Sequence, residues 1–427
     1  MRLKLHWQIL IAIVAAAIAG SLAGEQGAIF GLQFYAVFDF VGTLFINALK
    51  MLIVPLIASS IIVGVANIGT SKNLGAIGGK TLLFYVLTTF AAVLVGLFVM
   101  NLLQPGIADG QPVKEQLALE FDTAELAAKV EGRGISDVVD IFLRAVPPNI
   151  VDAAGKGEML GIIVFCLLFG YFMAHIEHEY AEPMFKFWNG MFQIMMKMTE
   201  WIMKFAPIGV FGLVAKVVAK TGFEAAGPLL TFAVGVLVAL AIHAFVTLPL
   251  LLRFLARVSP LRLFQAVSPA LLTAFSTASS SATLPVTMDC VEKEAGVSNK
   301  ISSFVLPLGA TVNMNGTALY ECSAALFLAQ AYGLEINLST QFIIVVVALV
   351  TSIGVAGIPS ASLVAIAIIL AAIGLPVEAI AVLFIFDRVL DMARTSVNVL
   401  GDASCAVIVA RLEGEKNVLQ EPVEASE

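Results

Sequence analysis

The chain has 427 residues, of which 59% are hydrophobic and 13% are charged, and its mean hydropathy is +0.97. Ordinary globular domains carry about 25% charged residues, so this composition excludes a soluble globular protein and indicates a polytopic membrane protein. The formal net charge is −7 and the sequence shows no basic face, which excludes nucleic-acid binding. Its four cysteines and four histidines show no disulfide or zinc spacing, so a zinc enzyme is also excluded.

Six apolar segments precede residue 260, at about 7–23, 37–68, 78–103, 135–176, 184–220 and 226–257. Basic residues precede the first segment, occupy the loop at 69–80 and follow the sixth segment, whereas the loop at 104–134 leans acidic. Positive charge marks cytoplasmic loops, so we expect an uncleaved first span, six crossings before residue 260 and both termini in the cytoplasm.

Two later segments, 261–297 and 335–375, are each interrupted by a run of small residues that contains a proline. The runs are STASSSATLP at 276–285 and SIGVAGIPSAS at 352–362, and each segment is followed by a polar helix, at 301–331 and 377–411. Paired interrupted segments are typical of the inverted repeats of secondary transporters, whose broken helix ends bind anions and sodium ions. Small residues also let helices pack closely, but two runs in matching positions favour re-entrant hairpins.

The helix at 301–331 contains the run NMNG at 313–316, a poor helix interior because Asn and Gly have low helix propensity. The sequence predicts an unwound point here, whose carbonyls coordinate a ligand. Glu321 lies further along the same face. A lone carboxylate there either titrates or pairs with an arginine such as Arg388 or Arg394, and the sequence leaves both alternatives open.

The stretch 387–402, DRVLDMARTSVNVLGD, places six polar residues inside an apolar segment. At about 100° per residue they fall within about 100° of arc on one helix face. An ionised group facing lipid costs several kcal/mol, so this stripe is expected to face protein, water, ions or a ligand. Its members are Asp387, Asp391, Arg394, Thr395, Asn398 and Asp402.

Taken together, these motifs resemble the dicarboxylate/amino acid:cation symporter family, which includes the glutamate transporters and their prokaryotic aspartate-transporter homologues. The resemblance covers nearly the whole chain: six spans, a serine-rich hairpin, an NMDGT-type helix, a second hairpin and a DxxxDMxRTxxNVxGD helix. It implies an all-α fold of eight transmembrane helices plus two re-entrant hairpins. It also implies an elevator-type homotrimer in the cell inner (plasma) membrane, in contact with lipid, that is not an enzyme and has no organic cofactor.

The resemblance implies a division into a static scaffold and a moving transport unit. The scaffold would comprise residues 1–75 and 135–222, and the transport unit residues 76–104 and 223–412, including both hairpins. Residues 105–134 would form an extracellular loop to which we assign no role. The acidic tail 413–427 is expected to be solvated and disordered on the cytoplasmic side.

Substrate-binding residues are implied position by position. Arg394 would pair with the substrate's side-chain carboxylate through its planar fork, and Asp391 would hold the α-amino group. The Ser280 backbone would bind the α-carboxylate, and the hairpin at 352–362 would close as a gate. The full implied set is Ser279, Ser280, Ser281, Thr317, Ile358, Asp391, Arg394, Thr395 and Asn398.

Coupling-ion sites are implied in the same way. Na⁺ site 1 would use Gly309, Asn313, Asn398 and Asp402, and Na⁺ site 2 would use Thr311 with Met314, Ser352, Ile353 and Val355. A third site would use Thr88, Thr89, Asn313 and the position of Asn315, where the family has an aspartate. An amide there removes a full charge from a desolvated cation site, so the third site is expected to be weak or absent. Glu321 matches the proton-carrying glutamate of the animal transporters and is the candidate for H⁺ coupling.

Two further positions depart from the family. Ala278 stands where the archaeal members of the family have an arginine in the first hairpin. Met392 stands where the animal members have an arginine next to the substrate-binding aspartate. Arg388 lies one helical turn before Met392 and is the candidate replacement.

Asp391 and Arg394 together select the substrate class. A C4-dicarboxylate has no amino group to neutralise Asp391, and a neutral amino acid would leave Arg394 unpaired in a dry pocket, at several kcal/mol. Aspartate or glutamate satisfies both charges, and the sequence does not choose between them.

Two other function classes are less favoured. An intramembrane serine hydrolase at 279–281 lacks a base, because His243 lies in a separate apolar span with nothing acidic adjacent. An ion channel is disfavoured by an Arg–Asp pair suited to a zwitterion.

Overall fold

The computed structural model describes residues 5–29, 32–69, 75–117, 119, 146–156, 159–222, 226–334, 336–354 and 362–419. Almost all regular structure in these ranges is helical, in agreement with the expected fold class. Two short antiparallel pairs add to it: β1 (Ala28–Ile29) with β2 (Leu32–Gln33), and β3 (Ile107–Ala108) with β4 (Gln111–Pro112).

One group of helices packs around α2 (Phe34–Gly69). It contains α1 (Leu5–Ala23), α7 (Met159–Met173), α8 (His178–Met203) and α9 (Ala206–Thr221); α1 packs on α9, and α2 packs on α7, α8 and α9. The short α6 (Ile150–Lys156) packs on α7. Glycine allows α2 and α9 to approach closely, since a Cβ at Gly212 would lie 2.7 Å from the Phe38 carbonyl oxygen. We call this set the first helix group.

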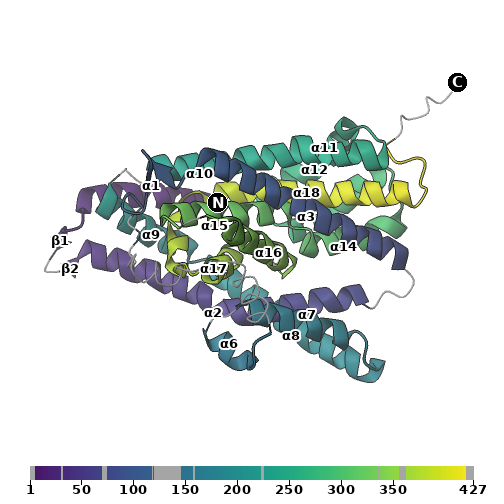
Figure 1. The fold of residues 1–427 in the computed structure, drawn as a ribbon, viewed down its shortest axis with the longest axis horizontal. Helices are drawn as coiled ribbons and strands as arrows, with labels where there is room; N and C mark the ends of the chain where they lie inside the picture. The colour runs from purple at the N-terminus through teal and green to yellow at the C-terminus, as the bar shows by residue number, and fades with distance from the viewer. Residues whose placement is uncertain are drawn as a thin grey trace.

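A second group packs around α15 (Asn315–Ala331), in which every residue is buried. It contains α3 (Gly75–Leu103), α14 (Asn299–Val312) and α18 (Phe384–Leu412), with η4 (Val377–Leu383) leading into α18. It also contains α10 (Ala226–Ile242), which continues through η1 (His243–Thr247), α11 (Leu248–Leu251) and η2 (Leu252–Ala256). In Figure 1, α18 runs beside α11 and α12 along one edge, whereas α2, α7 and α8 lie along the other.

Two helical hairpins complete the second group. The first joins α12 (Pro260–Thr277) to α13 (Ser280–Asp289) and continues through η3 (Cys290–Glu294); its tip turns at Ala278, which has a left-handed φ of 50°. The second joins α16 (Leu338–Gly354) to α17 (Ser362–Ala372), which pack on each other, and its tip at 355–361 lies outside the described residues. The predicted unwound point is also confirmed, because α14 ends at Val312 and α15 begins at Asn315.

Two helices in the described ranges are long and apolar enough to cross a membrane, Ile77–Leu103 and Ala226–Ala256, and several shorter apolar helices accompany them. Large apolar side chains such as Phe40, Phe98 and Phe254 are more than half exposed. An extensive apolar surface of this kind suits contact with lipid. With the composition, it agrees with a polytopic membrane protein.

The chain end differs from expectation in part: Glu413, Gly414, Lys416 and Asn417 are exposed to solvent, as predicted, but the two residues that follow them are not. Val418 and Leu419 are buried, and the Leu419 amide donates to the Ala295 carbonyl at 3.0 Å. The acidic composition concealed two apolar residues that pack against the base of the first hairpin.

Candidate functional site

All six polar residues of the stripe on α18 are buried. The helix packs against α12, α14 and α15, so the stripe faces protein, as the periodicity predicts. Buried charges require partners, and the stripe supplies most of them from within itself.

Arg394 is the centre of this stripe. Its Nε donates to Asp391 Oδ1 at 3.0 Å and its Nη1 donates to Asp387 Oδ1 at 3.0 Å. The ring of Tyr320, on α15, lies 4.3 Å from the guanidinium carbon, within range of a cation–π interaction. Two carboxylates and one aromatic face therefore fix the plane of the guanidinium.

Part of this charged cluster has no partner in the described part of the chain. Arg394 Nη2 and Arg388 Nε are buried without a hydrogen bond, although Arg388 Nη1 lies 3.8 Å from Asp391 Oδ2. Buried polar atoms are normally hydrogen-bonded, so unpartnered donors mark a place where a ligand can bind. Guanidinium donors suit a carboxylate in particular.

Asn398 joins the stripe to the start of α15. Its Oδ1 accepts from the Gly316 and Thr317 amides at 2.8 and 3.3 Å, and its Nδ2 donates to Thr317 Oγ1 at 3.0 Å. It thereby satisfies two backbone donors that a helix start leaves open. Gly316 is required here, because a Cβ would lie 2.5 Å from the Arg394 carbonyl oxygen.

The residues predicted for Na⁺ site 1 come together. Asn313 Nδ2 donates to Asp402 Oδ1 at 2.8 Å, and a side chain at Gly309 would collide with that carboxylate. Asn398 stands one turn before Asp402 on α18. The buried Asn313 Oδ1 has no partner in the described ranges, so carboxylate and amide oxygens of the type that binds a hard cation lie side by side.

The third-site residues also meet, but through neutral groups. Thr89 Oγ1 donates to Asn315 Oδ1 at 3.2 Å, and Asn315 Nδ2 lies 3.4 Å from His243 Nε2. Thr88 instead donates to the Phe84 carbonyl within its own helix. The described contacts of these residues therefore involve only neutral groups, and a weak or absent third site stays a prediction.

Na⁺ site 2 is only partly described. Thr311 Oγ1 donates to the Leu308 carbonyl and Ser352 Oγ donates to the Leu349 carbonyl, each inside its own helix, while α14 and α16 pack together. Met314 Sδ accepts from Asn398 Nδ2 at 3.3 Å, and Ile353 lies in the last turn of α16. Val355, and Ile358 of the substrate set, lie outside the described residues.

The predicted serines form the tip of the first hairpin. Ser279 caps α13 by accepting from the Ala282 amide at 3.2 Å; Ser280 is buried and Ser281 is exposed. The hairpin packs on α18, where Ser396 Oγ donates to the Leu271 carbonyl at 3.1 Å. The tip and the stripe thus belong to helices that pack on each other.

Glu321 is fully buried on α15. Thr351 Oγ1 donates to its Oε2 at 3.2 Å, and its Oε1 has no partner in the described part. The ion pairs of Arg388 and Arg394 found in the described ranges go to Asp387 and Asp391, so of the two alternatives for Glu321 the arginine pair is not formed.

Asp387 and Tyr320 were missed by sequence reasoning as parts of the site. Asp387 stands on the predicted stripe, and its spacing of seven residues from Arg394, two helical turns, was the available signal. Tyr320 gave no signal, because its contact depends on how α15 packs against α18.

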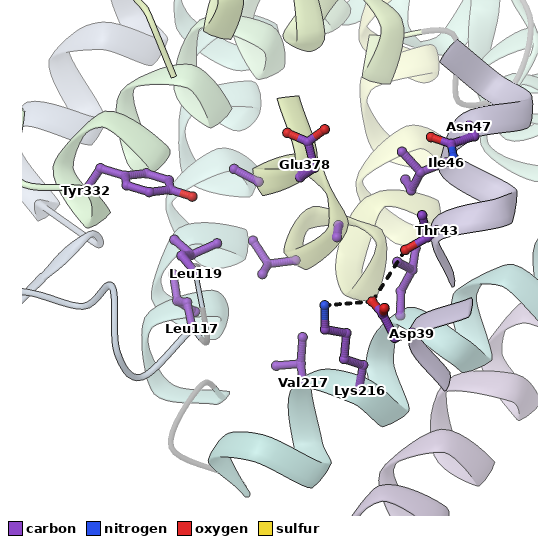
Figure 2. A pocket seen from close by; sticks show the side chains of 14 residues that line it. Asp39, Thr43, Ile46, Asn47, Leu117, Leu119, Lys216, Val217, Tyr332 and Glu378 are labelled. Carbon is purple, nitrogen blue, oxygen red and sulfur yellow. Dashed lines mark hydrogen bonds and ion pairs between the residues drawn. The ribbon is translucent and has the colours of Figure 1, made fainter. Parts of the chain in front are cut away.

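A cavity of about 230 Å³ lies away from the stripe, between α2 and α9 on one side and η4 and Tyr332 on the other (Figure 2). Lys216 Nζ lies 2.8 Å from Asp39 Oδ1 on the first wall, and Figure 2 shows Glu378 across the cavity. None of the predicted site residues lines it. It follows the seam between the two helix groups.

Comparisons with known proteins show which family and which transporters this chain is similar to. The model of the sodium:dicarboxylate symporter family matches residues 5–412. The chain is 35% identical over 416 residues to a proton/sodium-glutamate symport protein of Bacillus caldotenax, covering 97% of this chain and 96% of that protein. It is 34% identical to a proton/glutamate-aspartate symporter of Escherichia coli (strain K12), covering 97% and 94% of the two chains. It is also 34% identical to excitatory amino acid transporter 3 of Oryctolagus cuniculus, covering 96% and 86%.

Proposed function

The chain belongs to the sodium:dicarboxylate symporter family, and we infer that it takes up aspartate or glutamate in symport with Na⁺ and H⁺. One observation carries this inference. Arg394 Nε lies 3.0 Å from Asp391 Oδ1 in a buried site, and Arg394 Nη2 and Arg388 Nε have no hydrogen-bond partner in the described part of the chain. An acidic amino acid brings one extra carboxylate and one ammonium, which match these opposite charges.

We propose that the substrate's side-chain carboxylate binds the free edge of Arg394. Asp387 and Asp391 accept from Nη1 and Nε, so Nη2 is left to donate to a further acceptor. Asp391 accepts from the substrate's ammonium group, and Thr317, Thr395 and Asn398 bind the rest. The backbone at Ser280, near the start of α13, binds the α-carboxylate, as helix N-termini favour anions.

Coupling is proposed to depend on the oxygen groups at the α14–α15 break. Na⁺ bound among Gly309, Asn313, Asn398 and Asp402 is transported together with substrate, because Asn398 also contacts Thr317 of the substrate set. Glu321 is proposed as the proton carrier, since it is buried and not ion-paired in the described chain. The third site stays without a sodium ion, because Asn315 offers no charge.

Alternating access is proposed to follow an elevator scheme within a homotrimer. The first helix group is the static scaffold, and the second group, which holds the whole candidate site, moves. The cavity at the seam (Figure 2) is consistent with two bodies that pack loosely at this level. The second hairpin acts as the gate.

Uptake by purified protein in liposomes under an inward Na⁺ gradient tests this function. L-aspartate and L-glutamate should accumulate, whereas succinate and L-alanine, which each leave one charge of the pair unmatched, should not. Preferential uptake of succinate would favour the alternative of a C4-dicarboxylate symporter, and preferential uptake of L-alanine that of a neutral amino-acid symporter.

A further inference from the structure

The chain end at 413–419, which we call the strap, crosses the base of the first hairpin. The Leu419 amide donates to the Ala295 carbonyl at 3.0 Å, and Arg262 Nη1 donates to the Leu419 carbonyl at 3.1 Å. Ala295 follows the second arm of the hairpin, and Arg262 lies in the first turn of α12. The strap therefore binds both arms at the end opposite the tip.

Glu415 adds a charged contact to the strap. Its carboxylate accepts from the Ser298 amide at 3.0 Å and also from the Ser298 hydroxyl. Ser298 is the residue directly before α14, where a negative charge complements the helix dipole. The strap thus also fixes the link between the hairpin and the helix that leads to the Asn313 break.

Arg411, in the last turn of α18, connects the strap to the helix that carries the stripe. Its guanidinium donates to the Lys416 carbonyl at 2.8 Å, to the Glu415 carbonyl at 3.2 Å and to the Ala256 carbonyl, just before α12, at 3.3 Å. A guanidinium has five donors in a rigid plane, so this one side chain can hold both the strap and the end of η2 to α18.

The strap is docked by specific contacts. Leu419 has a φ of 55°, a conformation that bulky residues rarely adopt, and Val418 is 1% exposed. A side chain at Gly296 would lie 3.1 Å from the Asn417 carbonyl, so the hairpin base leaves space for the strap. A docked apolar pair and a strained backbone indicate that this position is defined by its surroundings.

We propose that Arg411 and Glu415 are positioning residues that clamp the base of the first hairpin to α18, so that its serine tip remains a fixed wall of the site. This rests on the proposed function, because the tip is taken to bind substrate. The hairpin arm α12 has 18 residues and is about 27 Å long, so a small rotation at the base moves the tip by a large distance.

A thiol at a buried position of the hairpin, one turn before its tip, reports whether the clamp is closed. Ala274→Cys puts it on a fully buried position of α12, which packs on α18. We would measure its rate of labelling by a water-soluble maleimide in the purified full chain, after subtracting the labelling of protein without the added cysteine. The test variants are Arg411→Met, which keeps an aliphatic stem, and Glu415→Gln, which keeps the shape but removes the charge.

Glu413→Gln is the matched control. It makes the same change of charge in the same segment, but Glu413 pairs with Lys80 of α3 at 2.6 Å and makes no ion pair or hydrogen bond with the hairpin in the described part of the chain. The Arg411 and Glu415 variants should label about tenfold faster than wild type, the population change expected when one hydrogen bond to a charged group is lost. The Glu413 variant should label at the wild-type rate.

Equal labelling rates in Glu415→Gln, Glu413→Gln and wild type would overturn the proposal, even if Arg411→Met fails to fold. A second readout is the KM for aspartate, which should rise in Glu415→Gln relative to both Glu413→Gln and wild type. A fall in the thermal unfolding midpoint with an unchanged KM would show a merely structural role and overturn the positioning. Labelling does not require transport, so the two proposals can fail separately. Absence of acidic amino-acid uptake would refute the proposed function, whereas the labelling rates alone would decide whether the clamp exists.

Discussion

Replacing Asp391 by Asn should change which substrates bind, and not only how tightly they bind. Asp391 is buried, accepts from Arg394 Nε at 3.0 Å and is proposed to accept from the substrate's ammonium group. The amide keeps the shape of the side chain but removes its charge. Aspartate then loses its ammonium partner, whereas succinate, which has no ammonium group, loses a repulsive neighbour.

The size of the change follows from the energy of a charged hydrogen bond. Such a bond contributes about 1.5–3 kcal/mol, so aspartate should bind about 10- to 150-fold more weakly to Asp391→Asn. Succinate should bind more tightly than it does to wild type, because a buried like charge has been removed. The ratio of the affinity for aspartate to the affinity for succinate should therefore fall by a larger factor than the affinity for aspartate itself.

Asp387→Asn provides the matched control for this prediction. Asp387 also accepts from Arg394 at 3.0 Å, from one turn earlier on the same helix, but no contact with the ammonium group is proposed for it. This substitution should weaken the binding of aspartate and of succinate by similar factors and leave the ratio of the two affinities unchanged. Equilibrium binding to purified protein in saturating Na⁺, with competition between the two ligands, measures both. An unchanged ratio in Asp391→Asn, or an equal change in both variants, would refute the assigned role.

Three further predictions concern the α14–α15 break and the coupling ions. Gly316→Ala should cost about 1–3 kcal/mol of stability by pushing α15 off the Arg394 backbone, whereas Gly190→Ala, with open space around it, should be neutral or stabilising in thermal unfolding. Asn315→Asp should restore a charge at the third site and make uptake depend more steeply on Na⁺ concentration; an unaltered dependence would count against a vestigial cation site. Glu321→Gln should abolish the response of uptake to an imposed pH gradient but preserve its response to Na⁺, and a retained pH response would place the proton elsewhere.

Much of the candidate site could be predicted from local sequence pattern. The period of the polar residues on 387–402 placed all six on a buried face, and low helix propensity located the break at Asn313 and Met314. These features depend on one helix at a time. The turn of the first hairpin, at Ala278, likewise fell inside the run of small residues.

What could not be predicted depends on contacts between distant segments. The stacking of Tyr320 on Arg394 and the approach of His243 to Asn315 each require the packing of a separate helix. The end of the strap was misjudged for a related reason, because the acidic composition suggests solvation throughout, whereas Val418 and Leu419 are buried and Arg411 donates to the backbone just before them. Tertiary contacts override composition when a charged side chain gains fixed partners.

The most direct test of cation-coupled uptake is aspartate accumulation in proteoliposomes with Na⁺ and H⁺ gradients imposed separately. The account predicts that an inward Na⁺ gradient alone concentrates aspartate above its external level, and that an inward H⁺ gradient adds to this accumulation. Accumulation that follows the H⁺ gradient and ignores Na⁺ would contradict the assignment of Asn313 and Asp402 to a sodium site. Uptake that only equilibrates aspartate across the membrane under both gradients would contradict symport itself.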